Sequence, residues 1–531
     1  MTKEVLLDVG VILDYVLGTG DYTSVQYIID KISNHQLYGF FPAGLVPLLS
    51  HLFEQKVTET PHSSTTYSKD KLKEVMSHLQ LITTTGKDIS AILDTGSSLT
   101  IEAAKRVCPD VMFITDCLSS LKQSKAFTPG AFVEYYKNRR KKKTDQVFFL
   151  NLKREYTNLM EEVDQALLSV GAKAQYIMGP EVSQFETDAA SYIGTKHAIG
   201  VASGTDALVL ALRALAIHQR EQEFFNEEDL IITSAFTFTA TGDAILRAGA
   251  TPLFVGIDPD SFNLNVEHVK KALSTDHVDK HRIVGILPVH LFGHSCDMDA
   301  IMNIAEQHSL FVLEDVAQAF GAEWKGEKLG SIGTIGAFSF YPTKNLGGFG
   351  DGGLVTTCDD RLAELVGMLL GHGGKDKYNV EHIGYNSRLD TIQASILQVK
   401  MRYIDEFNLR RRKIAEFYDQ GLQDLKDIKL PLLYYDSYQH IYHQYTICVT
   451  DGRRDQLRSA LKEKGIDTMV YYPIPLHQMK VFDGQCVKGE ELENVESVCS
   501  EVLNLPIGPL TSCEEVELVV TSIREFFYGG N

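Results

Sequence analysis

Four short segments of the 531-residue sequence carry residue types that suit the binding and activation of a charged cofactor. The first, Ser203-Gly204-Thr205-Asp206, follows an apolar run and begins an amphipathic helical pattern. A helix start offers unpaired N–H groups and a positive dipole end, and glycine lets the backbone approach closely, which suits a phosphate. The same residues are also an ordinary helix N-cap, so both interpretations stay open here.

The second segment, FVLEDVAQAFGA, ends a strongly apolar run in two acids, Glu314 and Asp315, with Gln318 three residues later. A carboxylate that ends a buried strand is costly unless a ligand or a partner uses its charge. The pattern indicates either a cofactor contact or a satisfied structural carboxylate.

The third and fourth segments are FSFYPTKNLGGFGDGG, with Ser339 and Lys344, and GYNSRLDTIQASIL, with Asn386 and Arg388. Burial lowers the pKa of a lysine and frees its amine, which makes Lys344 a candidate Schiff-base nucleophile. The alternative is a surface lysine whose stem packs on apolar residues. Asn386 and Arg388 stand before a helical pattern, where they would equally form a helix-entry turn.

The order of these segments predicts pyridoxal 5'-phosphate (PLP) as the cofactor. The helix start would hold its phosphate, the carboxylate its pyridinium nitrogen, and the lysine its aldehyde.

Alternating strand and helix patterns from Val147 onward would position these segments. Strand-like runs are AIGVAS, LIITSAF, TPLFVGID, RIVGILPVHLFG, LFVLEDV, IGAFSFYP and GGLVTTC, and most are followed by a helical pattern. This alternation predicts a mostly parallel sheet covered on both faces. A long helical pattern covers about 390–425, and the tail contributes a strand (YHQYTICV) and helices (RRDQLRSALKEKG and EEVELVVTSIREFFY).

From about residue 147 to 531 the chain resembles the DegT/DnrJ/EryC1/StrS family of nucleotide-sugar aminotransferases. The resemblance rests on stretches that follow one another in the family's order. They include IMGPEVSQFETDAASYIGTKHAIGVASGTDAL, SAFTFTATGDAILRAGATPLFVGID, PVHLFGHSCDMDAI, EDVAQAFGA, GAFSFYPTKNLGGFGDGG and GYNSRLDTIQASIL. It implies fold-type I of the PLP enzymes, with a large PLP-binding domain over 149–400 and a small C-terminal domain over 401–531.

The resemblance also implies roles for single residues. Lys344 would form the internal aldimine, Asp315 would face the pyridine nitrogen, and Gln318 would contact the ring 3-oxygen.

Gly204, Thr205 and Ser339 would hold the cofactor phosphate. Phe238 would stack on the cofactor ring, although aromatics in apolar runs are usually core. Asn386 would reach the phosphate in the neighbouring subunit, which implies a homodimer with shared active sites.

The implied reaction is transamination of a nucleotide-linked keto-sugar, with glutamate or glutamine as amino donor. Some relatives dehydrate sugars and carry histidine in place of the lysine, so Lys344 favours transamination over dehydration. The NSRLD segment is more similar to members that act on 3-keto sugars than to the 4-keto branch. Candidate substrate residues are Arg388, His372, Tyr472 and His477, each of which could instead be a structural contact. A PLP protein with a regulatory role and no turnover is a further alternative.

Residues 1–135 show their own α/β pattern, followed by a basic linker over 136–148 that contains the charge block 139–143. A strand is predicted to end near Asp8, another in DVMFITD, and a helix over KLKEVMSHLQLI. LLDVGVILDYVLG and FITDC…FTPGAFVEYY resemble PIN-like domains, nucleases that gather three or four carboxylates around Mg²⁺ or Mn²⁺. Only Asp8 and Asp116 match the expected acids, and Ser97 or Ser98 stands where a third is expected, so we expect a degenerate domain without nuclease activity. Metal-dependent RNA cleavage is the alternative.

Composition limits the classes of function further. The formal net charge of −19 argues against a nucleic-acid coat, and eight cysteines without CxxC spacing argue against a zinc knuckle. No apolar run reaches the 18 or so residues of a membrane span, and the N-terminus lacks a cleavage site, so we expect a cytoplasmic protein without membrane or metal partners.

Overall fold

The computed structural model describes residues 146–275, 279–376, 378–431, 438–489 and 492–528, together with the backbone of five strands nearer the N-terminus. The chain divides into two units, Met1–Asp145 with Ser512–Leu518 and Gln146–Thr511 with Val519–Asn531. Each unit is described by itself.

The first unit contains a fully parallel five-stranded sheet. Its strands are β1 (Glu4–Leu7), β2 (Tyr38–Pro42), β3 (Leu79–Ile82), β4 (Met112–Ile114) and β5 (Ala126–Phe127), in the spatial order β3-β2-β1-β4-β5. The strands predicted near Asp8 and in DVMFITD are present as β1 and β4. The helix predicted over 71–82 is wrong for its last four residues, which form β3, because a short apolar run fits either element. Asp8, Asp116, Ser97 and Ser98 lie outside the described residues.

The second unit is built on an eight-stranded sheet with the order β18-β8-β7-β9-β10-β13-β14-β6. Its strands are β6 (His197–Val201), β7 (Leu230–Ser234), β8 (Thr251–Val255), β9 (Ile283–Leu287), β10 (Phe311–Asp315), β13 (Ile335–Ser339), β14 (Gly353–Thr357) and β18 (Val487–Lys488). All neighbours pair in parallel except β14, which is antiparallel to both β13 and β6. The predicted mostly parallel sheet is therefore confirmed.

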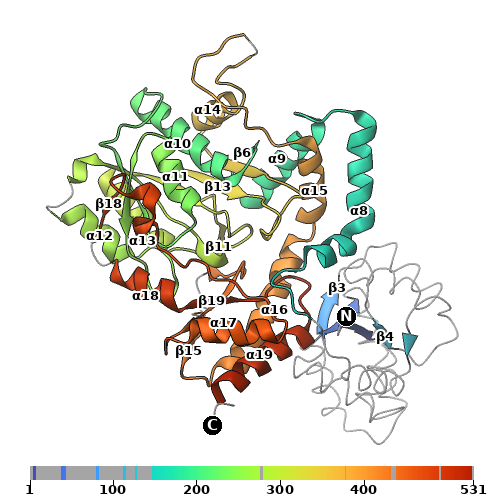
Figure 1. The fold of residues 1–531 in the computed structure, drawn as a ribbon. Coiled ribbons are helices and arrows are strands. Elements are labelled where there is room, and N and C mark those ends of the chain that lie inside the picture. The colour runs from blue at the N-terminus through green and yellow to red at the C-terminus, as the bar shows by residue number, and fades with distance from the viewer. Residues whose placement is uncertain are drawn as a thin grey trace, which may run out of the picture. The chain divides into compact units, whose positions relative to one another are not determined.

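Alternating strand residues face two separate apolar cores, which explains why these strands read as continuous apolar runs. Ile231 packs in a cluster with residues of α10 (Gly204–Arg220), α11 (Thr239–Arg247) and α14 (Asp360–Leu369). Leu230 and Ile232 pack in the other cluster, with residues of α9 (Pro180–Ile193), α12 (Val266–Ser274), α13 (Met298–His308) and α15 (Thr391–Met401). Figure 1 shows α10 and α11 beside this sheet in the second unit.

The helical pattern over about 390–425 forms two helices, α15 and α16 (Ile404–Leu422), instead of the single long helix expected. The interruption falls at Arg402 and Tyr403, and Tyr403 donates its backbone N–H to Lys400 O at 3.0 Å. Helix α8 (Leu152–Lys173) lies beside α15. The residue that caps its N-terminus is Asn151, whose side chain accepts the N–H of Arg154 at 2.9 Å. Such side-chain caps satisfy backbone donors that have no partner within the helix.

Two small sheets complete the unit. β15 (Ile428–Lys429), β17 (Tyr445–Val449) and β19 (Val502–Leu505) form one antiparallel sheet, and β11 (Glu323–Trp324), β12 (Glu327–Lys328) and β16 (Tyr438–Gln439) form the other. The remaining helices are α17 (Arg454–Glu463), α18 (Glu493–Glu501) and α19 (Cys513–Tyr528). The tail strand and the two tail helices expected from the sequence are present as β17, α17 and α19. Within the described residues, no helix combines the length and the apolarity that a membrane span requires.

Candidate active site

The candidate site lies where the carboxyl ends of β6, β7, β10 and β13 meet, because these four strands point the same way in the sheet. In sheets of this kind, ligands bind at that edge. Lys344 follows β13 in the connection to β14, and Asp315 is the last residue of β10.

Lys344 is held by the turn that returns the chain to β14. Its backbone N–H donates to Tyr341 O at 2.8 Å, and Gly348 N–H donates to Phe340 O at 2.8 Å. Burial of the amine lowers the pKa of Lys344 to about 8, although the charge of Asp315 opposes this shift. About a tenth of the amine is therefore unprotonated at pH 7, far more than for an ordinary lysine, and a nucleophile requires this form.

Asp315 is almost fully enclosed, with 4% of its surface exposed. One carboxylate oxygen accepts the Thr241 hydroxyl at 2.9 Å and the other accepts Ala317 N–H at 3.2 Å. Burial raises the pKa of Asp315, and the charge of Lys344 works in the opposite direction. A cation placed beside this carboxylate would offset the cost of burying it.

Glu314 is the structural acid of the pair. Its fully buried carboxylate accepts backbone N–H groups from Gly330 at 2.9 Å, Ile332 at 2.9 Å and Gly333 at 2.6 Å. It also pairs with His290 Nε2 at 3.0 Å. Protein donors saturate Glu314, which fits the structural interpretation of the sequence segment. The charge of Asp315 acts on Lys344, which fits the interpretation as a cofactor contact.

The predicted phosphate residues come together at the start of α10. Ser203 caps the helix by accepting Asp206 N–H at 3.1 Å. A Cβ on Gly204 would lie 2.5 Å from Ser339 Cβ, so only glycine allows the helix start and the end of β13 to approach this closely. Thr205 lies in the same first turn. The result is a cradle of backbone N–H groups at a positive helix end.

Gln318, Tyr472 and Phe238 form one side of the site. Gln318 accepts Phe292 N–H at 2.8 Å and donates to the Tyr472 hydroxyl at 3.0 Å. The rings of Phe238 and Tyr472 are 6.2 Å apart, and burial raises the pKa of the Tyr472 hydroxyl. Phe238 is 55% exposed, so it is not a core residue and its ring is free to cover a ligand.

The other predicted substrate residues lie elsewhere. His372, Asn386 and Arg388 belong to a hairpin after α14, in which His372 N–H donates to Tyr385 O at 2.8 Å and Arg388 donates to the Asn386 side chain. His477 is buried, and its Nε2 is 3.0 Å from Glu496 Oε1 of α18. This ion-pair geometry favours a structural role for His477.

Three residues near the site were missed in the sequence. Thr241 contacts Asp315, and buried His443 places its Nδ1 3.0 Å from Oδ1 of Asn345, the neighbour of Lys344. Burial and the charges of Lys344 and Arg411 lower the pKa of His443 well below its usual value, so His443 is neutral. The TFTATGD run is the only sequence signal that includes Thr241. No local pattern in the sequence indicates a contact between Asn345 and His443.

A site of this kind, at the carboxyl edge of a mostly parallel sheet, is typical of α/β enzymes that bind a charged ligand there. The chain belongs to the DegT/DnrJ/EryC1/StrS aminotransferase family, whose model matches residues 157–524. The aminotransferase family and the α/β fold predicted for this part of the chain are therefore confirmed, whereas the PIN-like resemblance of residues 1–135 stays a prediction.

Curated relatives align over most of their own length. A "Pleiotropic regulatory protein" from Geobacillus stearothermophilus is 42% identical over 71% of this chain and 98% of that protein. A dTDP-3-amino-3,4,6-trideoxy-alpha-D-glucose transaminase from Streptomyces venezuelae is 41% identical over 72% of this chain and 97% of that protein. The crystal structure of NtdA from Bacillus subtilis with bound cofactor PMP matches with a TM-score of 0.65, at 29% identity over 76% of this chain and 94% of that one.

Proposed function

We propose that this chain catalyses PLP-dependent transamination of a nucleotide-linked keto-sugar to an amino-sugar, with glutamate or glutamine as amino donor. The observation that carries the proposal is the lowered pKa of the Lys344 amine after β13, together with the buried carboxylate at the end of β10, Asp315, whose charge acts on that amine. Family membership and the transaminase name of a relative support the reaction class.

The residues present fit PLP. The start of α10, where the absence of a side chain on Gly204 lets Ser339 approach, suits the phosphate, together with Thr205. Asp315 would hold the proton on the pyridine nitrogen, and half-exposed Phe238 would cover the ring. When bound, PLP supplies an electron sink and carries the amino group between the two substrates.

The chemical steps assigned to the chain itself are proton movements and positioning. Lys344 Nζ accepts the proton from the donor Cα and delivers it to the cofactor C4′. The charge of Asp315 favours the protonated pyridine, which lets the ring accept electrons. Gln318, already fixed by Phe292 and Tyr472, would donate toward the ring 3-oxygen.

The same proposal covers the substrate and the assembly. We assign Arg388, His372 and Tyr472 to a nucleotide-sugar, which needs local positive or polar groups in a chain of net charge −19. The name of the Streptomyces relative supports a 3-keto substrate. Asn386, which is exposed in its own chain, would serve the neighbouring subunit of a cytoplasmic homodimer.

The central test uses the amino donor alone. Glutamate added to the holoenzyme is expected to convert the PLP absorbance to that of pyridoxamine phosphate, and Lys344→Ala abolishes this change. Lys325→Ala is the matched control, because Lys325 is exposed and pairs with Asp299. A wild-type spectrum that glutamate and glutamine both leave unchanged, or conversion that persists in Lys344→Ala, would overturn the assignment. A screen of UDP-, dTDP- and GDP-linked keto-sugars, read by NMR, then locates the new amine.

For the N-terminal unit we propose a PIN-like domain without nuclease activity, over about residues 1–135, joined by the 136–148 linker to domains at 149–400 and 401–531. Mn²⁺-dependent cleavage of single-stranded RNA that disappears in Asp8→Asn would contradict the absence of nuclease activity.

A further inference from the structure

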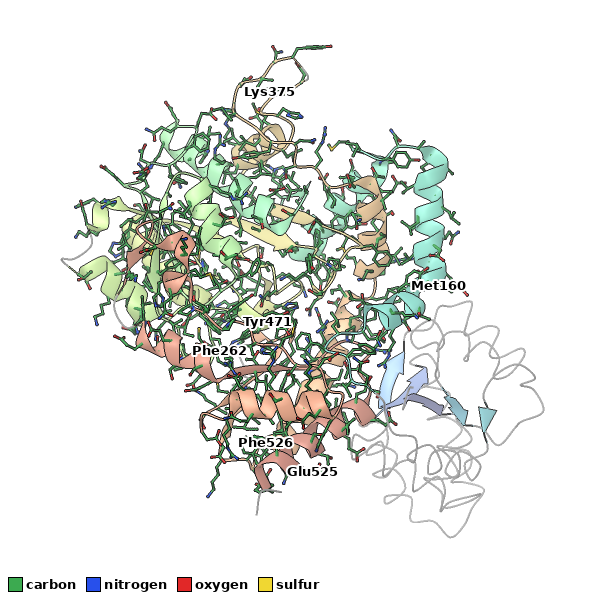
Figure 2. The ribbon with its side chains drawn as sticks, in the orientation of Figure 1. Met160, Phe262, Lys375, Tyr471, Glu525 and Phe526 are labelled. Carbon is green, nitrogen blue, oxygen red and sulfur yellow. The ribbon has the colours of Figure 1, made fainter. Side chains whose placement is uncertain are left out.

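A hairpin that projects beyond α14 carries three of the proposed ligand residues, His372, Asn386 and Arg388. We call it the projecting hairpin, residues 371–376 and 378–388. Its two arms pair through Gly371 with Asn386 and Gly374 with Val380. It extends away from the sheet in Figure 1, and Figure 2 places Lys375 near its outer end.

The outer part of the projecting hairpin has little core of its own. Tyr378, Val380 and Ile383 are exposed by 86%, 59% and 61%. A segment with so few buried apolar contacts needs other interactions to fix where its ligand residues lie. Those interactions are found at its base.

A fully buried guanidinium lies under the returning arm. Arg213 is in the middle of α10 with 0% of its surface exposed. It donates to the Tyr385 hydroxyl at 2.9 Å and to Ile383 O at 3.0 Å. It also donates to the Glu223 backbone O and to Glu223 Oε2, the latter at 2.9 Å.

Glu223 links the same guanidinium to the hairpin a second time. Its Oε2 accepts Ile383 N–H at 3.1 Å, and its Oε1 lies 2.7 Å from His382 Nδ1. Burial alone would raise the pKa of Glu223, but hydrogen bonds from His382 and Ile383 and the charge of Arg213 keep that pKa below its usual value. The carboxylate is therefore ionised at neutral pH and compensates the buried arginine.

The base of the hairpin is also tied to the first turn of α10. Ser387, between Asn386 and Arg388, donates its hydroxyl to Asp206 Oδ2 at 2.9 Å. One rigid, buried helix thus presents the phosphate cradle at its start and anchors the projecting hairpin two turns further on.

We propose that Arg213 and Glu223 form a clamp that positions Asn386 and Arg388 for the ligand site of the neighbouring subunit. This proposal rests on the proposed function. Arg213 and Glu223 touch neither substrate nor cofactor, so they are positioning residues. Buried, hydrogen-bonded ion pairs suit this task because their geometry is fixed and their loss is costly.

The first test is Arg213→Lys, which keeps the charge but loses the forked geometry. Loss of one charge-assisted hydrogen bond predicts about a tenfold rise in KM for the keto-sugar, with kcat changed much less. Arg220→Lys is the control, since Arg220 on the same helix pairs with Asp229 at 2.9 Å. Tyr385→Phe removes only one acceptor and remains informative if Arg213→Lys folds poorly. If the wild-type enzyme turns over and KM is unchanged in both clamp variants, the clamp is overturned. If the wild-type enzyme does not turn over, the proposed function is overturned instead.

The second test uses hybrid dimers of Lys344→Ala and Arg213→Lys subunits. If the clamp serves the neighbour, one of the two sites combines an intact Lys344 with an intact partner hairpin. Such hybrids are expected to recover about half of wild-type activity at low keto-sugar concentration, because one of two sites is complete. A merely structural role of Arg213 gives no such recovery, and hybrids that stay as impaired as the Arg213→Lys enzyme overturn the proposal.

Discussion

Lys344 and Lys400 both lie at the same glycine-rich turn, each under the charge of a carboxylate, and they differ in the contacts that the amine makes. Lys400 on α15 is 4% exposed, forms an ion pair with Glu155 of α8 and donates to Gly347 O at 2.6 Å. Lys344 feels the charge of Asp315, yet within the described part of the chain its amine forms no hydrogen bond or ion pair. An amine held by an ion pair and a hydrogen bond stabilises the fold, whereas a desolvated amine that forms neither is available for chemistry.

The strongest way to sharpen this comparison is Glu155→Gln in the structural pair. It removes the negative charge and leaves the Lys400 ammonium buried with neutral acceptors only, and breaking a buried ion pair costs about 3–5 kcal/mol of the free energy of unfolding. Denaturant unfolding measures this loss. Turnover per folded molecule is expected to stay within about twofold of wild type, because neither residue takes part in the proposed proton transfer. A stable Glu155→Gln protein with impaired turnover would contradict the division between the pairs.

The corresponding change in the site pair is Asp315→Asn. It removes the charge that would hold a proton on the cofactor ring, so turnover is expected to fall by about a hundredfold or more. A neutral amide is less costly to bury than a carboxylate, so the midpoint of thermal unfolding is expected to hold or rise. A large drop in that midpoint with ordinary turnover per folded molecule would place Asp315 with the structural acids.

Local patterns in the sequence predicted one pair but not the other. The strand end at Asp315, the helix start at Gly204 and the turn at Lys344 are each visible within a few residues, and their order indicated the site. Partners such as Glu155 with Lys400, or Arg213 with Tyr385, come from distant parts of the chain. A single sequence records neither contact, because tertiary packing alone brings these elements together. The break between α15 and α16 was missed for the same reason, since the apolar pattern continues across it.

The smallest expected effect is in the titration of Lys344 in the cofactor-free protein. Its folded pKa of about 8 lies below the roughly 10.4 of an unfolded lysine, so the folded state binds fewer protons between these values. The contribution of this residue to stability therefore falls as the pH decreases from about 10.4 to about 8, and it is constant below that range. The unprotonated fraction rises about tenfold between pH 7 and 9 and then levels off.

Acetylation with a neutral reagent, quantified by peptide mass spectrometry, measures that fraction. Lys325 is the internal control, because its hydrogen bond and ion pair with Asp299 raise its pKa. Acetylation of Lys344 is expected to plateau above about pH 9, while that of Lys325 continues to rise about tenfold per pH unit. If Lys344 kept the slope of Lys325 up to about pH 10, its amine would be an ordinary surface lysine. The contrast with Lys400 would then rest on hydrogen bonding alone, because the Lys344 amine would be protonated near neutral pH.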